Sequence, residues 1–100
     1  MRLNGKHEIL LDDGSRIKLV ETLATPKSTP SHEVSNNIYR IAADGAIVWQ
    51  IDAPEGVRER TPFTGLEVHE KEQVVGYRWD GNLFSIDVET GKATFLEFVK

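Results

Sequence analysis

Four short turn signals constrain the fold of this chain more than any other feature of its sequence. They are Asp13-Gly14, Asp44-Gly45, Asp80-Gly81 and Thr90-Gly91, and each lies between short runs rich in Ile, Val, Leu, Tyr, Phe or Trp. Asp-Gly suits a tight hairpin because glycine reaches positive φ without steric cost and the aspartate side chain caps its own turn. The pattern therefore predicts antiparallel β-hairpins.

The runs between these turns predict eight strands and no helix. A helix competes only over residues 66–73, which are rich in charge, but Leu66 and Val68 alternate there with Glu67 and His69, as in a half-buried strand. We predict strands near residues 7–12, 15–21, 37–42, 46–51, 64–69, 73–79, 82–87 and 93–99. The sequence thus predicts an all-β fold in which two hairpins are followed by a four-stranded meander.

Two segments carry too little apolar material to form core strands. Residues 22–36 contain Pro26, Pro30 and several Ser and Thr residues, so we predict a long surface loop there. Residues 53–63 form a second irregular connection. A chain of 100 residues can bury one modest core, and we expect a single all-β domain over residues 1–100.

Two segments that begin at Asn37 and Asn82 read as variants of one hairpin. Their aligned positions are Tyr39 with Phe84, Ile41 with Ile86, Gly45 with Gly91 after one inserted residue, and Trp49 with Phe95. A spacing of about 45 residues, with four short strands in each unit, is typical of propeller blades. We predict that the six apolar residues of this alignment form the core and that the two glycines make the turns.

The second of these segments resembles the repeat of quinoprotein-type β-propellers. Residues 84–95, Phe-Ser-Ile-Asp-Val-Glu-Thr-Gly-Lys-Ala-Thr-Phe, are similar to the aromatic-Ala-Leu-Asp-x-x-Thr-Gly-Lys-x-x-Trp stretch of those blades, and residues 41–49 follow it loosely, without the Thr and Lys. The resemblance implies that Trp49 and Phe95 dock against a neighbouring blade. It implies no quinone site, because that cofactor is bound outside the repeat. Asn-Ile-Tyr-Arg-Ile and Asp-Gly-x-Ile-Val-Trp also resemble phrases of small uncharacterised bacterial proteins of similar length.

Two blade-like units cannot close a ring of six to eight blades, which leaves three arrangements. The units pack face to face as a small sandwich or barrel, several chains complete a ring, or a homodimer covers the exposed faces. We favour the compact sandwich or barrel-like domain and leave its dimerisation open.

Charge and composition narrow the class of partner. The chain has 12 basic and 16 acidic residues and a net charge of -4, so it lacks the positive field that binds nucleic acid or an anionic membrane. It has no cysteine, which excludes disulfides and thiolate chemistry. We find no signal peptide and no stretch long enough to span a membrane. We therefore expect a cytoplasmic protein whose partner is another protein or a second copy of itself.

One tryptophan and several arginines supply weak candidate binding sites. Trp79 precedes the Asp80-Gly81 turn and is flanked by Arg78 and Asp80, so its ring is a candidate platform for a sugar or another small ligand. Arg58 and Arg60 in the second irregular connection offer forked donors to a carboxylate or phosphate of a partner, with pairing inside the chain as the alternative.

No residue pattern predicts catalysis, a metal or a cofactor. Glu67, His69 and Glu70 come nearest to an acid-base or metal site, and a solvated polar face is the simpler interpretation. We therefore expect a protein-interaction module, homo-oligomeric or not, rather than an enzyme. The alternative is a carbohydrate-binding or other small-ligand protein with its site near Trp79.

Overall fold

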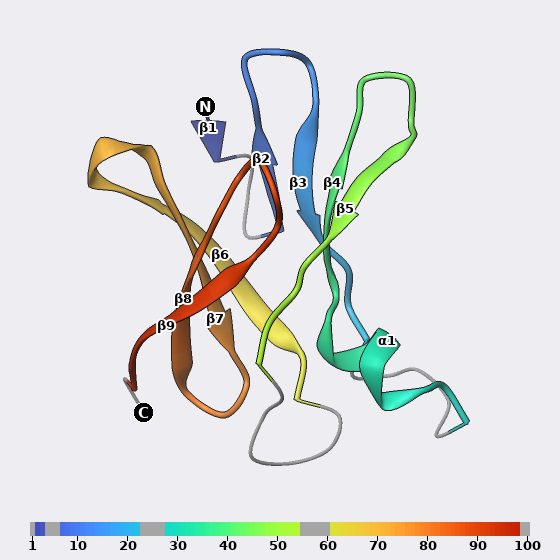
Figure 1. The fold of residues 1–100 in the computed structure, drawn as a ribbon, viewed down its shortest axis with the longest axis vertical. Helices are drawn as coiled ribbons and strands as arrows, with labels where there is room; N and C mark the ends of the chain where they lie inside the picture. The colour runs from blue at the N-terminus through green and yellow to red at the C-terminus, as the bar shows by residue number, and fades with distance from the viewer. Residues whose placement is uncertain (1, 4–6, 23–27, 55–60, 99–100) are drawn as a thin grey trace.

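The computed structural model describes residues 2–3, 7–22, 28–54 and 61–98, which form strands, one short α-helix and one 3-10 turn (Figure 1). The strands are β1 (Arg2–Leu3), β2 (Glu8–Leu10), β3 (Arg16–Leu19), β4 (Ile38–Ile41), β5 (Ile47–Gln50), β6 (Phe63–His69), β7 (Gln73–Arg78), β8 (Asn82–Ile86) and β9 (Ala93–Phe98). The helix α1 covers Ser31–Ser35 and the 3-10 turn η1 covers Glu70–Glu72.

The strands form two antiparallel sheets, and within each sheet the strands follow the order of the sequence. The first sheet has the order β1-β2-β3-β4-β5 and the second the order β6-β7-β8-β9. The prediction of an all-β fold with hairpins and a four-stranded meander is confirmed. The first two hairpins are also joined to each other, because β3 pairs with β4 from Arg16↔Ile41 to Leu19↔Ile38.

The hairpin turns follow the predicted glycine chemistry with one exception. Gly45 and Gly91 have φ values of 94° and 79°, which side-chain-bearing residues rarely adopt. The β6–β7 hairpin instead turns through Lys71 and Glu72, with φ values of 60° and 57°. The sequence offered no glycine or asparagine to mark this turn, so the alternation of apolar residues alone predicted the two strands.

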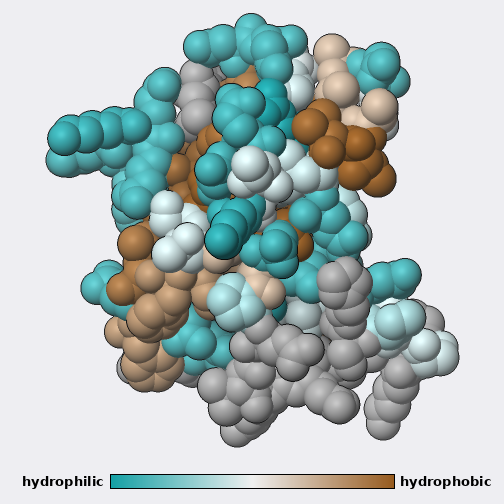
Figure 2. Space-filling view, viewed as in Figure 1, coloured by the Kyte–Doolittle hydropathy of each residue, from teal (hydrophilic) through white to brown (hydrophobic). Residues whose placement is uncertain are grey.

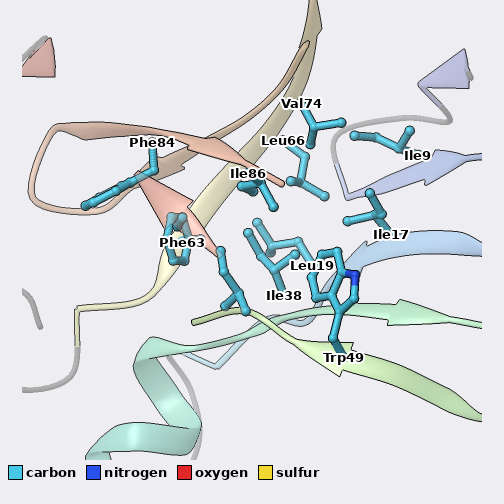
Figure 3. Close-up of a cluster of buried hydrophobic side chains, with 12 residues drawn as sticks. Ile9, Ile17, Leu19, Ile38, Trp49, Phe63, Leu66, Val74, Phe84 and Ile86 are labelled. Carbon is cyan, nitrogen blue, oxygen red and sulfur yellow. The ribbon is translucent and has the colours of Figure 1, made fainter. Parts of the chain in front are cut away.

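The two sheets pack face to face over one shared core (Figure 3). The first sheet and the residue after β5 contribute Ile9, Ile17, Leu19, Ile38, Trp49 and Ile51, and the second contributes Phe63, Leu66, Val74, Phe84, Ile86 and Ala93. In β3 and β8 these side chains alternate along the strand, as in a strand buried on one face, whereas an irregularity in β6 separates Phe63 from Leu66 by three positions. The arrangement is a small two-layer sandwich.

The core prediction is right at three of its six positions and wrong at one. Trp49, Phe84 and Ile86 are buried, whereas Tyr39 and Ile41 are only half-buried. Phe95 was expected in the core, yet 52% of it is exposed. It packs edge to face on Phe84, with ring centroids 6.0 Å apart, but β9 is the last strand of its sheet and only its first residue, Ala93, joins the shared core.

The predicted loop over residues 22–36 contains the helix α1, which corrects the expectation of no helix. The amides of Glu33 and Val34 donate to the carbonyl of Pro30, at 3.0 and 3.2 Å. Val34 is 1% exposed, and its carbonyl accepts a 2.8 Å hydrogen bond from the hydroxyl of Thr22. The burial of Val34, the hydrogen bond from Thr22 and a 2.9 Å hydrogen bond from the amide of Thr61 to the hydroxyl of Ser35 therefore hold a helical turn that the sequence pattern does not reveal.

A short main-chain link joins the two sheets at one edge. Beyond β5, Asp52 forms a parallel bridge with Lys92, in which the amide of Asp52 donates to the carbonyl of Gly91 and the amide of Ala93 donates to the carbonyl of Asp52, at 2.9 and 2.8 Å. The start of β9 is thus already paired with the segment that follows β5.

Candidate functional site

Arg78, one of the predicted binding residues, lies inside the protein. Its side chain is 1% exposed; Nε donates to the carbonyl of Thr61 at 2.8 Å, and Nη1 donates to the carbonyl of Pro54. These two carbonyls flank positions 55–60 in the second irregular connection. The guanidinium therefore joins the two ends of this connection. Its Nε and Nη1 donate to the protein's own main chain rather than to a partner.

Two aromatic rings complete the surroundings of the Arg78 guanidinium. Its central carbon lies 4.8 Å from the ring centroid of Phe63 and 5.4 Å from that of Phe84. Burial lowers the pKa of Arg78, and the charge of Asp80 opposes that shift. Cation–π contacts and carbonyl acceptors are the groups that stabilise a buried guanidinium. Arg78 is thus a structural residue of the core.

The residues around Arg78 are not brought together into one site. Trp79 points outward and is 43% exposed, whereas the carboxylate of Asp80 accepts hydrogen bonds from the amide and the side chain of Asn82, both at 3.1 Å. The other two predicted contact residues, Arg58 and Arg60, lie outside the described residues.

Glu67 and His69 form an exposed pair at the end of β6. The carboxylate of Glu67 lies 2.7 Å from Nε2 of His69, and 61% and 40% of their side chains are exposed. Glu70 follows in the turn and is also exposed. The pair lies on the same face of β6, as the alternation predicted.

Arg40 forms a polar network that joins the two sheets. Its Nη2 lies 2.8 Å from the carboxylate of Asp13, its Nε donates to the hydroxyl of Ser15 at 3.1 Å, and its Nη1 donates to the carbonyl of Val88 at 2.9 Å. The same carbonyl accepts a 2.8 Å hydrogen bond from Nε1 of Trp49. The hydrogen bonds from Ser15, and then the contact with Arg40, lower the pKa of Asp13.

Asn37 is a structural residue that the sequence marked only as the start of one of the two related segments. It is 1% exposed, and its Nδ2 donates to the carbonyls of Val20 and Phe63, at 2.8 and 2.9 Å. Its Oδ1 accepts the amide of Phe63 at 2.8 Å. One amide side chain thus continues the ladder of the first sheet and holds the start of β6. Its only sequence signal is an asparagine at the start of an apolar run.

The exposed apolar surface is concentrated on two edge strands. On β9, Phe95, Leu96 and Phe98 are 52%, 42% and 61% exposed, and on β5, Ile47 and Val48 are 66% and 50% exposed. Figure 2 shows apolar surface over the β9 side of the molecule, at the lower left, and beside the β4–β5 hairpin, at the upper right. Sequence reasoning missed the β9 surface because it placed Phe95 in the core.

The edge of β9 is open along most of its length. Asp52 pairs with its first residues, and no other described strand lies on that side, since β9 is the last strand of its sheet. The parallel pairing stops where Pro54 follows, because proline has no N–H with which to continue a ladder. From Phe95 to Phe98, therefore, the strand presents its edge together with large apolar side chains.

The described residues contain neither a metal-binding cluster nor a membrane-spanning helix. Within residues 2–3, 7–22, 28–54 and 61–98, no three side chains of the metal-binding types gather closely enough to hold an ion. In the same part of the chain, no helix is long and apolar enough to cross a membrane.

Comparison with known proteins identifies a family. No curated protein and no solved structure matches the chain. A family model described as a domain of unknown function (DUF7957) matches residues 13–98, a span that includes all strands from β3 to β9. Since this match covers well over half of the sequence, the protein belongs to the DUF7957 family of domains of unknown function.

Proposed function

We propose that this protein is a non-enzymatic protein-interaction module that binds its partner at the open edge of β9. The observation that carries the proposal is the coincidence of an unpaired strand edge with three exposed apolar side chains, Phe95, Leu96 and Phe98. An edge strand offers a row of N–H and C=O groups to which an extended segment of another chain can add as a further strand.

The chain itself supports the view that this edge accepts a strand. Asp52 is bound there through two main-chain hydrogen bonds, to Gly91 and from Ala93. Strand addition uses the same kind of bond, so main-chain pairing supplies affinity while apolar side chains at alternate positions supply specificity. The remaining edge, from Phe95 onward, continues the line of groups that Asp52 uses.

The β5 edge is the weaker candidate of the two. It has four residues against six in β9, and two exposed large apolar side chains, Ile47 and Val48, against three. Both edges carry a bulge: Phe84↔Phe95 and Leu83↔Glu97 leave Leu96 as an extra residue in β9, and Arg40↔Trp49 and Ile41↔Ile47 leave Val48 as one in β5. A bulge and a charged residue such as Glu97 limit unspecific association of an edge strand, which suits reversible binding.

Two substitutions at one position test the proposal. The amide of Phe95 points to the same side of β9 as that of Ala93, away from β8, because backbone groups alternate along a strand. Phe95→Pro removes this outward N–H, and Phe95→Thr removes the ring alone. Immobilised wild-type and variant proteins would be incubated with extract of the cells that produce the protein.

We expect partners retained by the wild type to be reduced by Phe95→Thr and lost with Phe95→Pro. Val48→Thr on β5 is the matched control and should retain them. The same set of partners bound by all four proteins would overturn the proposal. Circular dichroism and thermal unfolding of each variant show whether the fold is kept.

Binding of a sugar or another small ligand at Trp79 is the second candidate. The exposure of the Trp79 ring favours it, although the flanking Arg78 and Asp80 side chains are engaged inside the protein. Trp79→Ala should then abolish binding to the glycans that the wild type retains on an array, and the absence of any bound glycan would remove this candidate.

A further inference from the structure

We propose that the partner at the β9 edge is a second copy of this chain, which pairs antiparallel with β9 about a two-fold axis at Phe95. This inference rests on the function proposed above and names the occupant of that surface. The four-stranded sheet of one copy then joins that of the other copy to form one continuous sheet of eight strands. A two-fold contact requires a surface that is complementary to itself, and the residues of β9 meet this requirement.

The main-chain groups set which residues can face each other. In an antiparallel pair, two residues directly opposite each other either exchange hydrogen bonds through their amides and carbonyls or both direct these groups away from the partner strand. Ala93 and Phe95 point away from β8, but the amide of Ala93 is already bound by Asp52. Phe95 is therefore the first residue of β9 whose amide and carbonyl can both pair with a new strand, and in a symmetric pair they meet those of Phe95 in the second copy.

The charges on β9 favour this register over its neighbours. Register with β8 places Thr94 opposite Ser85 and Glu97 opposite Leu83, so Thr94 and Glu97 lie on the same face, with Leu96 as the bulge. When Phe95 faces its own copy, Thr94 lies opposite Glu97 of the other copy. Lys92, on that face and exposed, is then the diagonal neighbour of the same Glu97, so two opposite-charge contacts form by symmetry.

The two adjacent registers are each disfavoured by a feature of the structure. Shifting the pairing toward the start of β9 centres it on Thr94 and requires the amide of Ala93, which Asp52 occupies. Shifting it toward the end centres it on Glu97 and places two like charges directly opposite each other, which is destabilising. In the register centred on Phe95, Asp52 blocks only the outer pair, in which Ala93 would face Phe98 of the other copy, so pairing is confined to Phe95 and the two flanking Thr94–Glu97 pairs.

The apolar side chains agree with the same arrangement. Phe95 lies opposite Phe84, and Phe98 lies opposite Asn82, so the two exposed phenylalanines share one face of the sheet. Symmetric pairing brings the two Phe95 rings together on that face, next to the buried ring of Phe84, and leaves one Phe98 at each end of the contact. A contact of one strand pair is smaller than the usual stable interface of about 1,600 Å², so we expect a reversible dimer that dissociates on dilution.

Sedimentation equilibrium over a range of concentrations tests the association. We expect the wild type and Val48→Thr to show a concentration-dependent dimer. Phe95→Pro removes two hydrogen bonds, one from each copy, and should weaken the dimer about tenfold or more, beyond the loss caused by Phe95→Thr. A wild type that remains monomeric into the high micromolar range would overturn the inference.

Cysteine cross-linking tests the register, because the chain contains no native cysteine. Thr94 and Glu97 of the two copies should form a pair without hydrogen bonds, in which Cα atoms lie about 4.5 Å apart, within the range of a disulfide. An equimolar mixture of Thr94→Cys and Glu97→Cys should therefore cross-link faster than either variant alone. Faster cross-linking of Thr94→Cys alone or of Glu97→Cys alone would indicate one of the two adjacent registers and would overturn the proposed one.

The outcomes separate this inference from the proposed function. A monomeric wild type whose cellular partners are lost with Phe95→Pro would retain the β9 edge as a binding surface for a different protein and exclude the second copy. A monomeric wild type whose cellular partners are also retained by Phe95→Pro would exclude both the dimer and the proposed function of the β9 edge.

Discussion

The indole ring of Trp49 lies so close to Gly91 that a Cβ atom at position 91 would stand 2.6 Å from Cδ2 of the ring. The ring also donates from Nε1 to the carbonyl of Val88 in the same turn. The β8–β9 hairpin of the second sheet is thus shaped around a side chain of the first sheet. This contact requires both the absence of a side chain at position 91 and its positive φ.

Gly91→Ala should therefore destabilise the protein more than Gly45→Ala. Both glycines have positive φ, but a Cβ at Gly45 meets nothing within 4 Å. We expect a loss of about 1 kcal/mol at Gly45 from backbone strain alone, and about 3 kcal/mol at Gly91 from strain and overpacking together. Urea unfolding measures both values. Equal losses would show that the ring of Trp49 moves aside at little cost.

Arg78→Met should cost about 3 kcal/mol of unfolding free energy, because the carbonyl of Pro54 and the buried carbonyl of Thr61 lose a charged donor. Arg78→Lys should recover little of this, since an ammonium cannot donate in two directions as the guanidinium fork does. The control is Arg16→Met, whose exposed side chain lies 3.7 Å from Glu8, and we expect a loss below about 0.5 kcal/mol. Similar losses at both arginines would contradict the structural role of Arg78.

Asn37→Ala should cost about 3 kcal/mol, because it leaves the carbonyl of Val20 and the buried carbonyl and amide of Phe63 without their partner. Hydrogen exchange provides a local readout, since the amide of Phe63 donates to Asn37 and should lose protection. Asn82→Ala is the control; its half-buried side chain donates to Asp80, and a loss of about 1 kcal/mol is expected. Unchanged protection at Phe63 would contradict this role of Asn37.

Asp13→Asn should change how stability depends on pH. The pKa of Asp13 is lowered by the hydrogen bonds from Ser15 and by Arg40, so its carboxylate stabilises the fold above the unfolded value near 3.8. That contribution is lost as the pH falls through the lower folded pKa. The difference in unfolding free energy between wild type and Asp13→Asn should thus be constant above about pH 5 and shrink in stronger acid.

Nuclear magnetic resonance titration of the Asp13 carboxyl identifies which contact lowers its pKa. Ser15→Ala should raise the pKa of Asp13 more than Arg40→Met does, because the Ser15 hydrogen bond is the largest contribution. A pKa of Asp13 in the wild type at or above the usual aspartate value would contradict the prediction.

The strands were predictable because their signals are local. An Asp-Gly turn restricts the backbone of its own residues, and alternating apolar residues mark one face of a strand wherever that strand lies. The predicted range 82–87 accordingly contains β8, and the predicted range 73–79 contains β7. The resemblance to propeller blades stays a prediction, although its two segments do form the β4–β5 and β8–β9 hairpins.

The candidate site was not predictable in the same way. Alternation shows that Phe95 and Ala93 share a face, but only the packing of the two sheets decides that Ala93 is covered and Phe95 is not. It also decides that Arg78 points between two aromatic rings while its neighbour Trp79 points to solvent. The helix α1 depends in the same way on tertiary structure, through the burial of Val34 and its hydrogen bond from Thr22.

The sequence by itself therefore determined the strands β2 to β9, the glycine turns and the all-β class, because each follows from conformational preferences within a few residues. The tertiary structure alone decided which apolar residues are buried and which strand edge stays open. Burial depends on where the opposite sheet ends, and that boundary is set by contacts between residues far apart in the chain, such as Asp52 with Lys92 and Trp49 with Gly91.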